Sequence, residues 1–160
     1  MTTPGSIRKP AAHTIAVLSV SSAEEDHFLL QDIFSSPRPT LYPDLAFTMT
    51  ARSTISAAKS VLQQGRIAIV ICEHDLASGS WKELLDFAER LSAPPPVIVT
   101  SRGADERMWA EVLNLGGYHV LARPFNNEEV IRTVTSAWSL WQHQFRFQAE
   151  RTRRAGGNAA

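Results

Sequence analysis

The 160 residues of this chain include 16 Lys and Arg and 16 Asp and Glu, so the formal net charge is zero and a nucleic-acid footprint over the whole domain is not indicated. A hydrophobic content of 44% is typical of a globular protein, and a chain of this length buries one core. The single cysteine, Cys72, excludes an intrachain disulfide and is expected to be a small buried hydrophobe. Since neither a membrane span nor a signal-peptide pattern is present, we expect a cytoplasmic protein without a membrane contact.

Apolar β-branched runs alternate with helical patterns along the chain. Residues 1–13, rich in Pro, Ala and Thr, are expected to form a flexible arm. Strands are predicted over 14–20, 45–49, 67–72, 97–100 and 119–122, and the first of these is expected to be buried on both faces. Helices are predicted from Ser22 to about Phe34, from Ser53 or Thr54 to before Gly65, over 80–91, over 105–115, and from Asn126 or Asn127 onward. Five strands that are each followed by a helix predict one parallel, doubly wound α/β sheet with helices on both faces.

The first predicted helix begins with a cluster of polar residues. Ser22 and Glu25 match a capping box, which places Glu24, Glu25 and Asp26 in the first turn, where they favour the helix dipole and are expected to face water. Three apolar residues are expected to form the core-facing side of this helix: Phe28, Leu29 and Ile33.

Polar residues follow four of the five predicted strands. In a doubly wound sheet the carboxyl ends of the central strands form the working site. This rule brings together Ser21-Ser22, Glu73-His74-Asp75, Thr100-Ser101 and Arg123. His74 is expected to be an ordinary surface-loop histidine, because no second histidine stands at a zinc-binding spacing.

The segment 96–125 resembles the second half of a bacterial response-regulator receiver domain. The residues that carry the resemblance are Ser101 at the end of a strand, Gly116 after a helix, and Arg123-Pro124-Phe125 after the last strand. The resemblance extends over residues 14–140 and implies a flavodoxin-like strand order 2-1-3-4-5. It also implies a cis peptide bond between Arg123 and Pro124, as in the Lys-Pro bond of that family.

The resemblance implies a site in which several family residues are replaced. Receivers hold Mg²⁺ on an acidic pair, phosphorylate an Asp, and bind the phosphoryl oxygens through a Thr or Ser and a Lys. Here Ser21 and Ser22 stand at the acidic pair, Glu73 at the phosphoacceptor, Ser101 at the Thr/Ser position and Arg123 at the Lys. Val120 stands where many receivers carry a Tyr or Phe.

These replacements predict a degenerate receiver that is neither an enzyme nor a metal or cofactor binder. Two serine hydroxyls carry no charge to offset the dehydration of Mg²⁺, and Glu73 is longer than the usual acceptor. Asp75 is the alternative phosphoacceptor, which requires a two-residue slip and a displaced metal site. An unrelated flavodoxin-like enzyme or nucleotide binder is a further alternative, although no glycine-rich loop follows the first strand.

Glu73 and Arg123 also form a candidate ion pair. A guanidinium binds carboxylates well, and we expect Ser101 to donate a hydroxyl bond to the pair. Such a pair would permanently imitate the phosphoryl–Lys contact of an activated receiver. The alternative is that both side chains are solvated separately.

Aromatic residues on two predicted helices suggest a protein partner. Trp109 lies on the helix over 105–115, and Trp138, Trp141 and Phe145 lie on the last helix. Trp138 is expected to be largely buried, whereas Trp141 and Phe145 continue the stripe past the edge of the domain, into an extension and basic tail over 141–160. We expect a homodimer or another signalling protein to cover them, the alternative being that the helix folds back on its own domain.

Overall fold

The computed structural model describes residues 13–36 and 44–157, and within the last helix it leaves the side chains of residues 145–153 and 157 undescribed. The predicted flexible arm therefore lies outside the described residues, except for His13, which already belongs to the first strand. No described helix is both long and apolar enough to cross a membrane.

Five parallel strands form a single sheet in the order β2-β1-β3-β4-β5, which confirms the predicted α/β fold and strand order. The strands are β1 (His13–Val20), β2 (Leu45–Arg52), β3 (Ile69–Glu73), β4 (Val97–Ser101) and β5 (His119–Ala122). Every residue of β3 and β4 is buried, as expected for central strands that are covered on both faces.

The helices are α1 (Glu24–Ser35), α2 (Ile55–Gln63), α3 (Trp81–Glu89), α4 (Glu106–Asn114) and α5 (Asn127–Gly157). Three of them begin at a side-chain cap that accepts a backbone N–H bond: Thr54, Ser80 and Asp105. Asn126 caps α5 in the same way, because its Oδ1 accepts the N–H of Glu129. Short polar side chains therefore set these helix starts close to the predicted positions.

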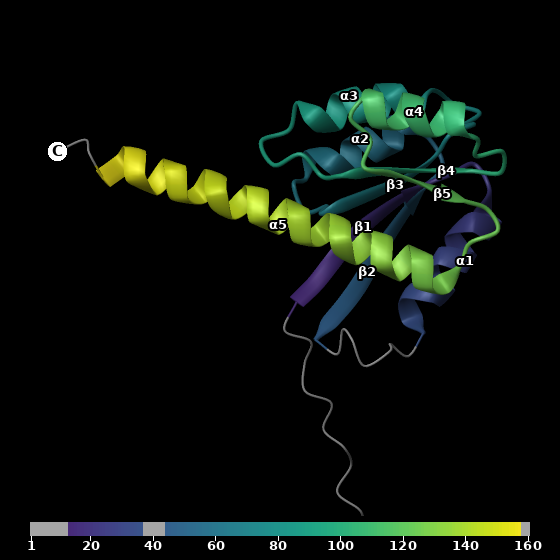
Figure 1. Ribbon diagram of the computed structural model, residues 1–160, viewed down its shortest axis with the longest axis horizontal. Coiled ribbons are helices and arrows are strands. Elements are labelled where there is room, and N and C mark those ends of the chain that lie inside the picture. The colour runs from purple at the N-terminus through teal and green to yellow at the C-terminus, as the bar shows by residue number, and fades with distance from the viewer. Residues whose placement is uncertain (1–12, 37–43, 158–160) are drawn as a thin grey trace, which may run out of the picture.

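The helices cover the sheet in two layers (Figure 1). The helices α2, α3 and α4 pack on one face around Trp81, which is 2% exposed, whereas α1 and α5 pack on the other face around Ile15 and Leu30. Helices therefore cover both faces of the sheet, and the carboxyl ends of the strands remain uncovered, so polar side chains can lie there.

The start and the orientation of α1 differ from the prediction. Its N-cap is Ala23, no side chain caps it, and the expected capping box of Ser22 and Glu25 is wrong. Phe28 and Leu29 point outward and are 67% and 42% exposed. The buried face consists of Asp26, Leu30, Ile33 and Phe34. Only Ile33 of the predicted face packs inward, because the helix is rotated from the predicted orientation.

The last helix spans 31 residues and is therefore about 46 Å long, so its C-terminal half projects from the body (Figure 1). Val130, Val134 and Ala137 are fully buried. Trp138 is only partly buried, and Trp141 packs partly buried against the same core cluster. The packing of Trp138 agrees with the expectation that most of its surface is covered, whereas the expectation that Trp141 lies past the edge of the domain is wrong. The side chain of Phe145 is outside the described part of the chain.

Candidate functional site

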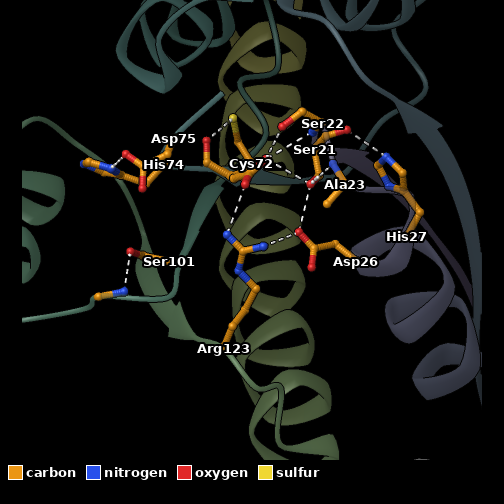
Figure 2. Close-up of polar contacts among 12 residues, drawn as sticks. Ser21, Ser22, Ala23, Asp26, His27, Cys72, His74, Asp75, Ser101 and Arg123 are labelled. Carbon is orange, nitrogen blue, oxygen red and sulfur yellow. Dashed lines mark hydrogen bonds and ion pairs between the residues drawn. The ribbon is translucent and has the colours of Figure 1, made fainter. Parts of the chain in front are cut away.

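The carboxyl ends of the strands bring together side chains that are far apart in the sequence (Figure 2). Ser21 follows β1, Glu73 ends β3 and Arg123 follows β5, while Asp26 reaches the same place from the first turn of α1. The result is a compact polar cluster at the edge of an otherwise apolar sheet, which we call the Glu73 cluster: Ser21, Ser22, Asp26, Glu73 and Arg123.

Arg123 lies between two carboxylates. Its Nη1 is 2.5 Å from Oδ2 of Asp26, and its Nη2 is 3.1 Å from Oε1 of Glu73. The exposed fractions of the three side chains are 8% for Arg123, 6% for Asp26 and 10% for Glu73, so solvent screens these ion pairs only weakly. The predicted Glu73–Arg123 pair is confirmed, but the guanidinium divides its two ends between Glu73 and Asp26.

The two serines hold the other oxygen of Glu73. Oε2 of Glu73 lies 3.0 Å from the hydroxyl of Ser21, from the backbone nitrogen of Ser22 and from the hydroxyl of Ser22. The Ser21 hydroxyl also lies 2.8 Å from Oδ2 of Asp26, and since it carries one proton it donates to only one of the two carboxylates at a time. Both carboxylate oxygens of Glu73 are therefore bonded, and Ser21 links the two acidic residues.

Asp26 was expected to face water, and this expectation is wrong, because the residue is 4% exposed and pairs with Arg123. The signal was present in the sequence. Asp26, Leu30, Ile33 and Phe34 are spaced at i, i+4, i+7 and i+8, which is one face of a helix. The apparent capping box favoured the other orientation.

His27 is a further residue that sequence reasoning did not select. Its two ring nitrogens lie 2.9 Å from the Ser19 hydroxyl and 3.1 Å from the carbonyl oxygen of Ser21. These contacts connect His27, in the first turn of α1, to the end of β1 (Figure 2), and so help to position Ser21, whose hydroxyl bonds to Glu73.

Three other predicted site residues, Ser101, Asp75 and Val120, lie outside the Glu73 cluster; Ser101 and Asp75 are labelled in Figure 2. The Ser101 hydroxyl accepts the backbone N–H of Gly103 at 3.1 Å, so the expected bond from Ser101 to the ion pair is absent and the serines after β1 replace it. The side chain of Asp75 is 76% exposed and lies 2.8 Å from the Nδ1 atom of His74. Val120 is fully buried.

Hydrogen bonding controls the protonation of the Glu73 cluster. Burial favours the neutral acid, but the bonds from Ser22, Ser21 and Arg123 together lower the pKa of Glu73 below its ordinary value of 4.5. Burial acts to lower the pKa of Arg123, but the bonds and charges of Asp26 and Glu73 outweigh it and raise that pKa above its ordinary value. Beside the cluster, burial and the charge of Glu73 raise the pKa of the Cys72 thiol to about 12. Glu73 and Arg123 are therefore both charged at neutral pH.

A receiver-like site implies Mg²⁺, and the residues present do not fit that ion. The guanidinium of Arg123 already occupies the space between the carboxylates of Asp26 and Glu73, and an added dication would be repelled by it. The serine hydroxyls at the positions of the usual acidic pair bring no negative charge. In the described residues, no group of three or more His, Cys, Asp or Glu side chains is placed to hold a metal.

The peptide bond between Arg123 and Pro124 is cis, as predicted from the resemblance.

Solved structures with this fold are numerous, and those similar to the chain include receiver domains. The receiver domain of an HD domain-containing protein from Pseudomonas fluorescens Pf-5 superposes with a TM-score of 0.68 at 20% identity, over 91% of this chain and 98% of its own. The response regulator domain of CheB from Thermotoga maritima gives a TM-score of 0.65 at 18% identity, over 79% and 98%. A response regulator receiver domain from Clostridium thermocellum gives 0.65 at 12% identity, over 81% and 98%.

No protein-family profile matches the chain, and no curated protein is similar to it in sequence. At these identities, the structural neighbours establish a receiver-like fold. The chemistry of the site depends on the residues of this chain and does not follow from the fold.

Proposed function

We propose that this chain is an interaction module of two-component signal transduction, with a receiver-like fold whose Glu73 position does not accept a phosphoryl group. The fold supports the signalling role by analogy, because solved structures of this architecture include response-regulator domains. The geometry of the Glu73 cluster supports the loss of phosphoryl transfer.

The observation that carries the proposal is the complete engagement of the Glu73 carboxylate. Oε1 accepts from Arg123, and Oε2 has three donors within 3.0 Å. A carboxylate attacks phosphorus through a free oxygen lone pair, beside a cation that neutralises the charge of the donor phosphate. Here the bonds that would have to break are charge-assisted and buried, and the cation that is present is already paired.

In this proposal, the Glu73 cluster permanently replaces the phosphorylated state. Arg123 contacts the Glu73 carboxylate as a receiver lysine contacts a phosphoryl group, and Ser21, Ser22 and Asp26 complete the anchoring that the metal supplies elsewhere. The domain then has one fixed conformation of its β5 end, and its signal depends on which partner is bound rather than on phosphorylation. Asp75 is a weaker acceptor candidate, because its side chain is exposed and, among the residues that the structure describes, no lysine or arginine lies within ion-pair distance of it.

The proposed partner surface includes α4 and α5. Only Val112 of α4 is buried, while Leu113 and Leu115 beside it are 50% and 46% exposed. Trp109 is partly buried and packs edge-on against His119, with 4.7 Å between the ring centroids. Trp138, Trp141 and Phe145 are the proposed contributions of α5 to the same role.

Intact-mass spectrometry tests the proposal. The full chain is incubated with acetyl phosphate and Mg²⁺, next to an ordinary phosphorylatable receiver that verifies the reagent. We expect no phosphoryl adduct and, in the presence of beryllofluoride, no change in the amide spectrum around Glu73. A stoichiometric adduct refutes the proposal. An adduct that persists in Glu73→Gln but disappears in Asp75→Asn instead identifies Asp75 as the acceptor.

A further inference from the structure

The outward face of α1 is both apolar and acidic. Phe28 and Leu29 are 67% and 42% exposed, and both lie one helical turn from acidic residues. Glu24 and Asp32 flank Phe28 at i−4 and i+4, and Glu25 precedes Leu29 by four residues. All three acidic residues are exposed, and α1 carries no lysine or arginine.

A cavity of about 290 Å³ adjoins this face. Glu25, Asp26 and Leu29 line it from α1, Arg123, Pro124 and Phe125 line it from the segment after β5, and Arg102 lines it from the loop after β4. Leu29, Pro124 and Phe125 form an apolar side of the cavity that suits an aromatic or aliphatic side chain from outside. We call this surface the α1 patch: Glu24, Glu25, Phe28, Leu29, Asp32 and the cavity. A ligand that suits it is a basic helix with apolar side chains.

The chain itself contains a segment of that chemistry. Residues 142–157 carry four arginines, one glutamate and two phenylalanines, for a formal charge of +3. Residues 13–141 carry 10 Lys and Arg against 15 Asp and Glu, for a formal charge of −5. The zero net charge of the protein thus conceals an acidic body joined to a basic helical extension, since the backbone of residues 142–157 continues α5.

The extension cannot reach the α1 patch of its own chain. The first turns of α5 lie beside α1, whereas the extension leaves the body on the opposite side (Figure 1). Because α5 is one continuous helix, Gln142 lies about 22 Å along its axis from the start of the helix, and each later residue lies farther away. Only a second molecule can bring a basic extension onto this acidic patch.

We propose that two copies of this chain associate by docking the α5 extension of each copy on the α1 patch of the other. The exchange is reciprocal, so the contact occurs twice in one symmetric dimer, and the dimer is closed rather than open-ended. The inference names a partner for the proposed interaction module and a face, α1, that the α4 and α5 surface does not include. It does not depend on whether Glu73 can be phosphorylated.

Charge-reversal variants of the full chain test this arrangement by light scattering after size exclusion, and by sedimentation over a concentration series. Wild type is expected to approach twice the monomer mass of 17.7 kDa. Glu24→Lys/Asp32→Lys and Arg151→Glu/Arg154→Glu should each weaken dimerisation at least about tenfold, because like charges then face each other. Mixed in equal amounts, these two variants should form a dimer again, since both contacts of the mixed pair are complementary.

Two further variants control for fold and for general charge effects. Glu89→Lys/Glu106→Lys makes the same change in net charge on α3 and α4, on the other face of the sheet, and should dimerise like wild type. Phe28→Ala removes an exposed side chain and should weaken the dimer several-fold without shifting the unfolding midpoint. Circular dichroism verifies that each variant is folded.

Three results overturn the inference. One is a wild-type chain that stays monomeric up to about 0.3 mM, because its dissociation constant would then lie far above the micromolar range. Another is a Glu24→Lys/Asp32→Lys variant that dimerises like wild type, which shows that the extensions pair with each other or that another surface is used. The third is a mixture of the two charge-reversed variants that remains monomeric. Each of these results leaves the phosphorylation test unaffected.

Discussion

Replacing Arg123 with methionine removes the only cation of the Glu73 cluster while keeping a side chain of similar length. The variant leaves two carboxylates in a site where their side chains are 6% and 10% exposed. Glu73 retains its two bonds from Ser22, whereas Asp26 is left with the Ser21 hydroxyl, whose single proton can go to only one of the two carboxylates at a time. Unpaired negative charge in a weakly solvated site raises the free energy of the folded state.

Removal of one partner from a buried ion pair typically costs about 3–5 kcal/mol. For a chain of this size each kcal/mol lowers the melting temperature by about 2–4 °C, so we expect Arg123→Met to melt about 10 °C lower than wild type at pH 7. Glu73→Gln removes one of the two stranded charges. The double variant should therefore be more stable than the sum of the single effects predicts, by at least about 1 kcal/mol.

The stability difference between wild type and Arg123→Met should depend on pH. In wild type the pKa of Glu73 is lowered, so its contribution to stability is present above its ordinary value of 4.5 and is lost as the pH falls through the folded-state value. In Arg123→Met the guanidinium no longer helps to lower the Glu73 pKa, so part of this contribution to stability is lost above pH 4.5. The difference in stability between the two proteins should therefore be largest near pH 7 and shrink towards pH 4.5.

Urea unfolding followed by circular dichroism at pH 7 and at pH 4.5 measures these differences. Arg102→Met, at an exposed position on the adjacent loop, is the matched control and should stay within about 0.5 kcal/mol of wild type. If Arg123→Met loses less than about 1 kcal/mol at pH 7, or if its loss is independent of pH, the buried ionic cluster does not exist as described.

Three further predictions concern residues outside the ion pair. The thiol of Cys72, with a pKa of about 12, should react with a disulfide reagent at pH 8 only at the rate of unfolding, and rapid labelling of the native protein would contradict its burial. Burial lowers the pKa of His119 below 6.5, with Glu129 opposing this shift and Arg132 adding to it. As the pH falls below 6.5, the unfolded chain takes up a proton at His119 more readily than the folded chain, so the free energy of unfolding should decrease. The variant His119→Gln should show a weaker dependence of stability on pH in this range. Gly116→Ala should cost about 1 kcal/mol in urea unfolding, because φ is +103° there; loss of that cost in Gly116→Ala/Glu89→Ala would show instead that the clash with the flexible Glu89 carboxylate is responsible.

Much of the fold follows from local patterns in the sequence. Ser80 and Asp105 cap α3 and α4 through bonds to residues two or three positions away, and Gly65 and Gly116, with positive φ, follow α2 and α4. The run Ile69–Cys72 is apolar throughout, which indicates a strand buried on both faces, as is typical of a parallel sheet. The Glu73–Arg123 pair was also predictable, because both residues follow the carboxyl ends of strands and carry opposite charge.

Sequence reasoning failed where two local signals competed. Ser22 and Glu25 have the spacing of a capping box, yet in the folded chain Ser22 donates to Glu73, a residue 51 positions away. The Ser22 hydroxyl is therefore bonded to Glu73 rather than capping the helix, and α1 is rotated so that Asp26 faces Arg123, 97 positions away. Phe28 and Leu29 are turned outward as a consequence, which no local rule indicated.

The sequence alone determined the α/β class, the strand order through its resemblance, and the absence of the usual acidic pair after the first strand. Only the tertiary structure decided that Asp26 joins the Glu73 cluster, that Ser101 stays outside it, and that Trp141 packs against the core. The physical reason is the range of the forces involved. Caps, turns and strand patterns depend on neighbours in the chain, whereas a buried charge takes its partner from whichever element the fold places beside it.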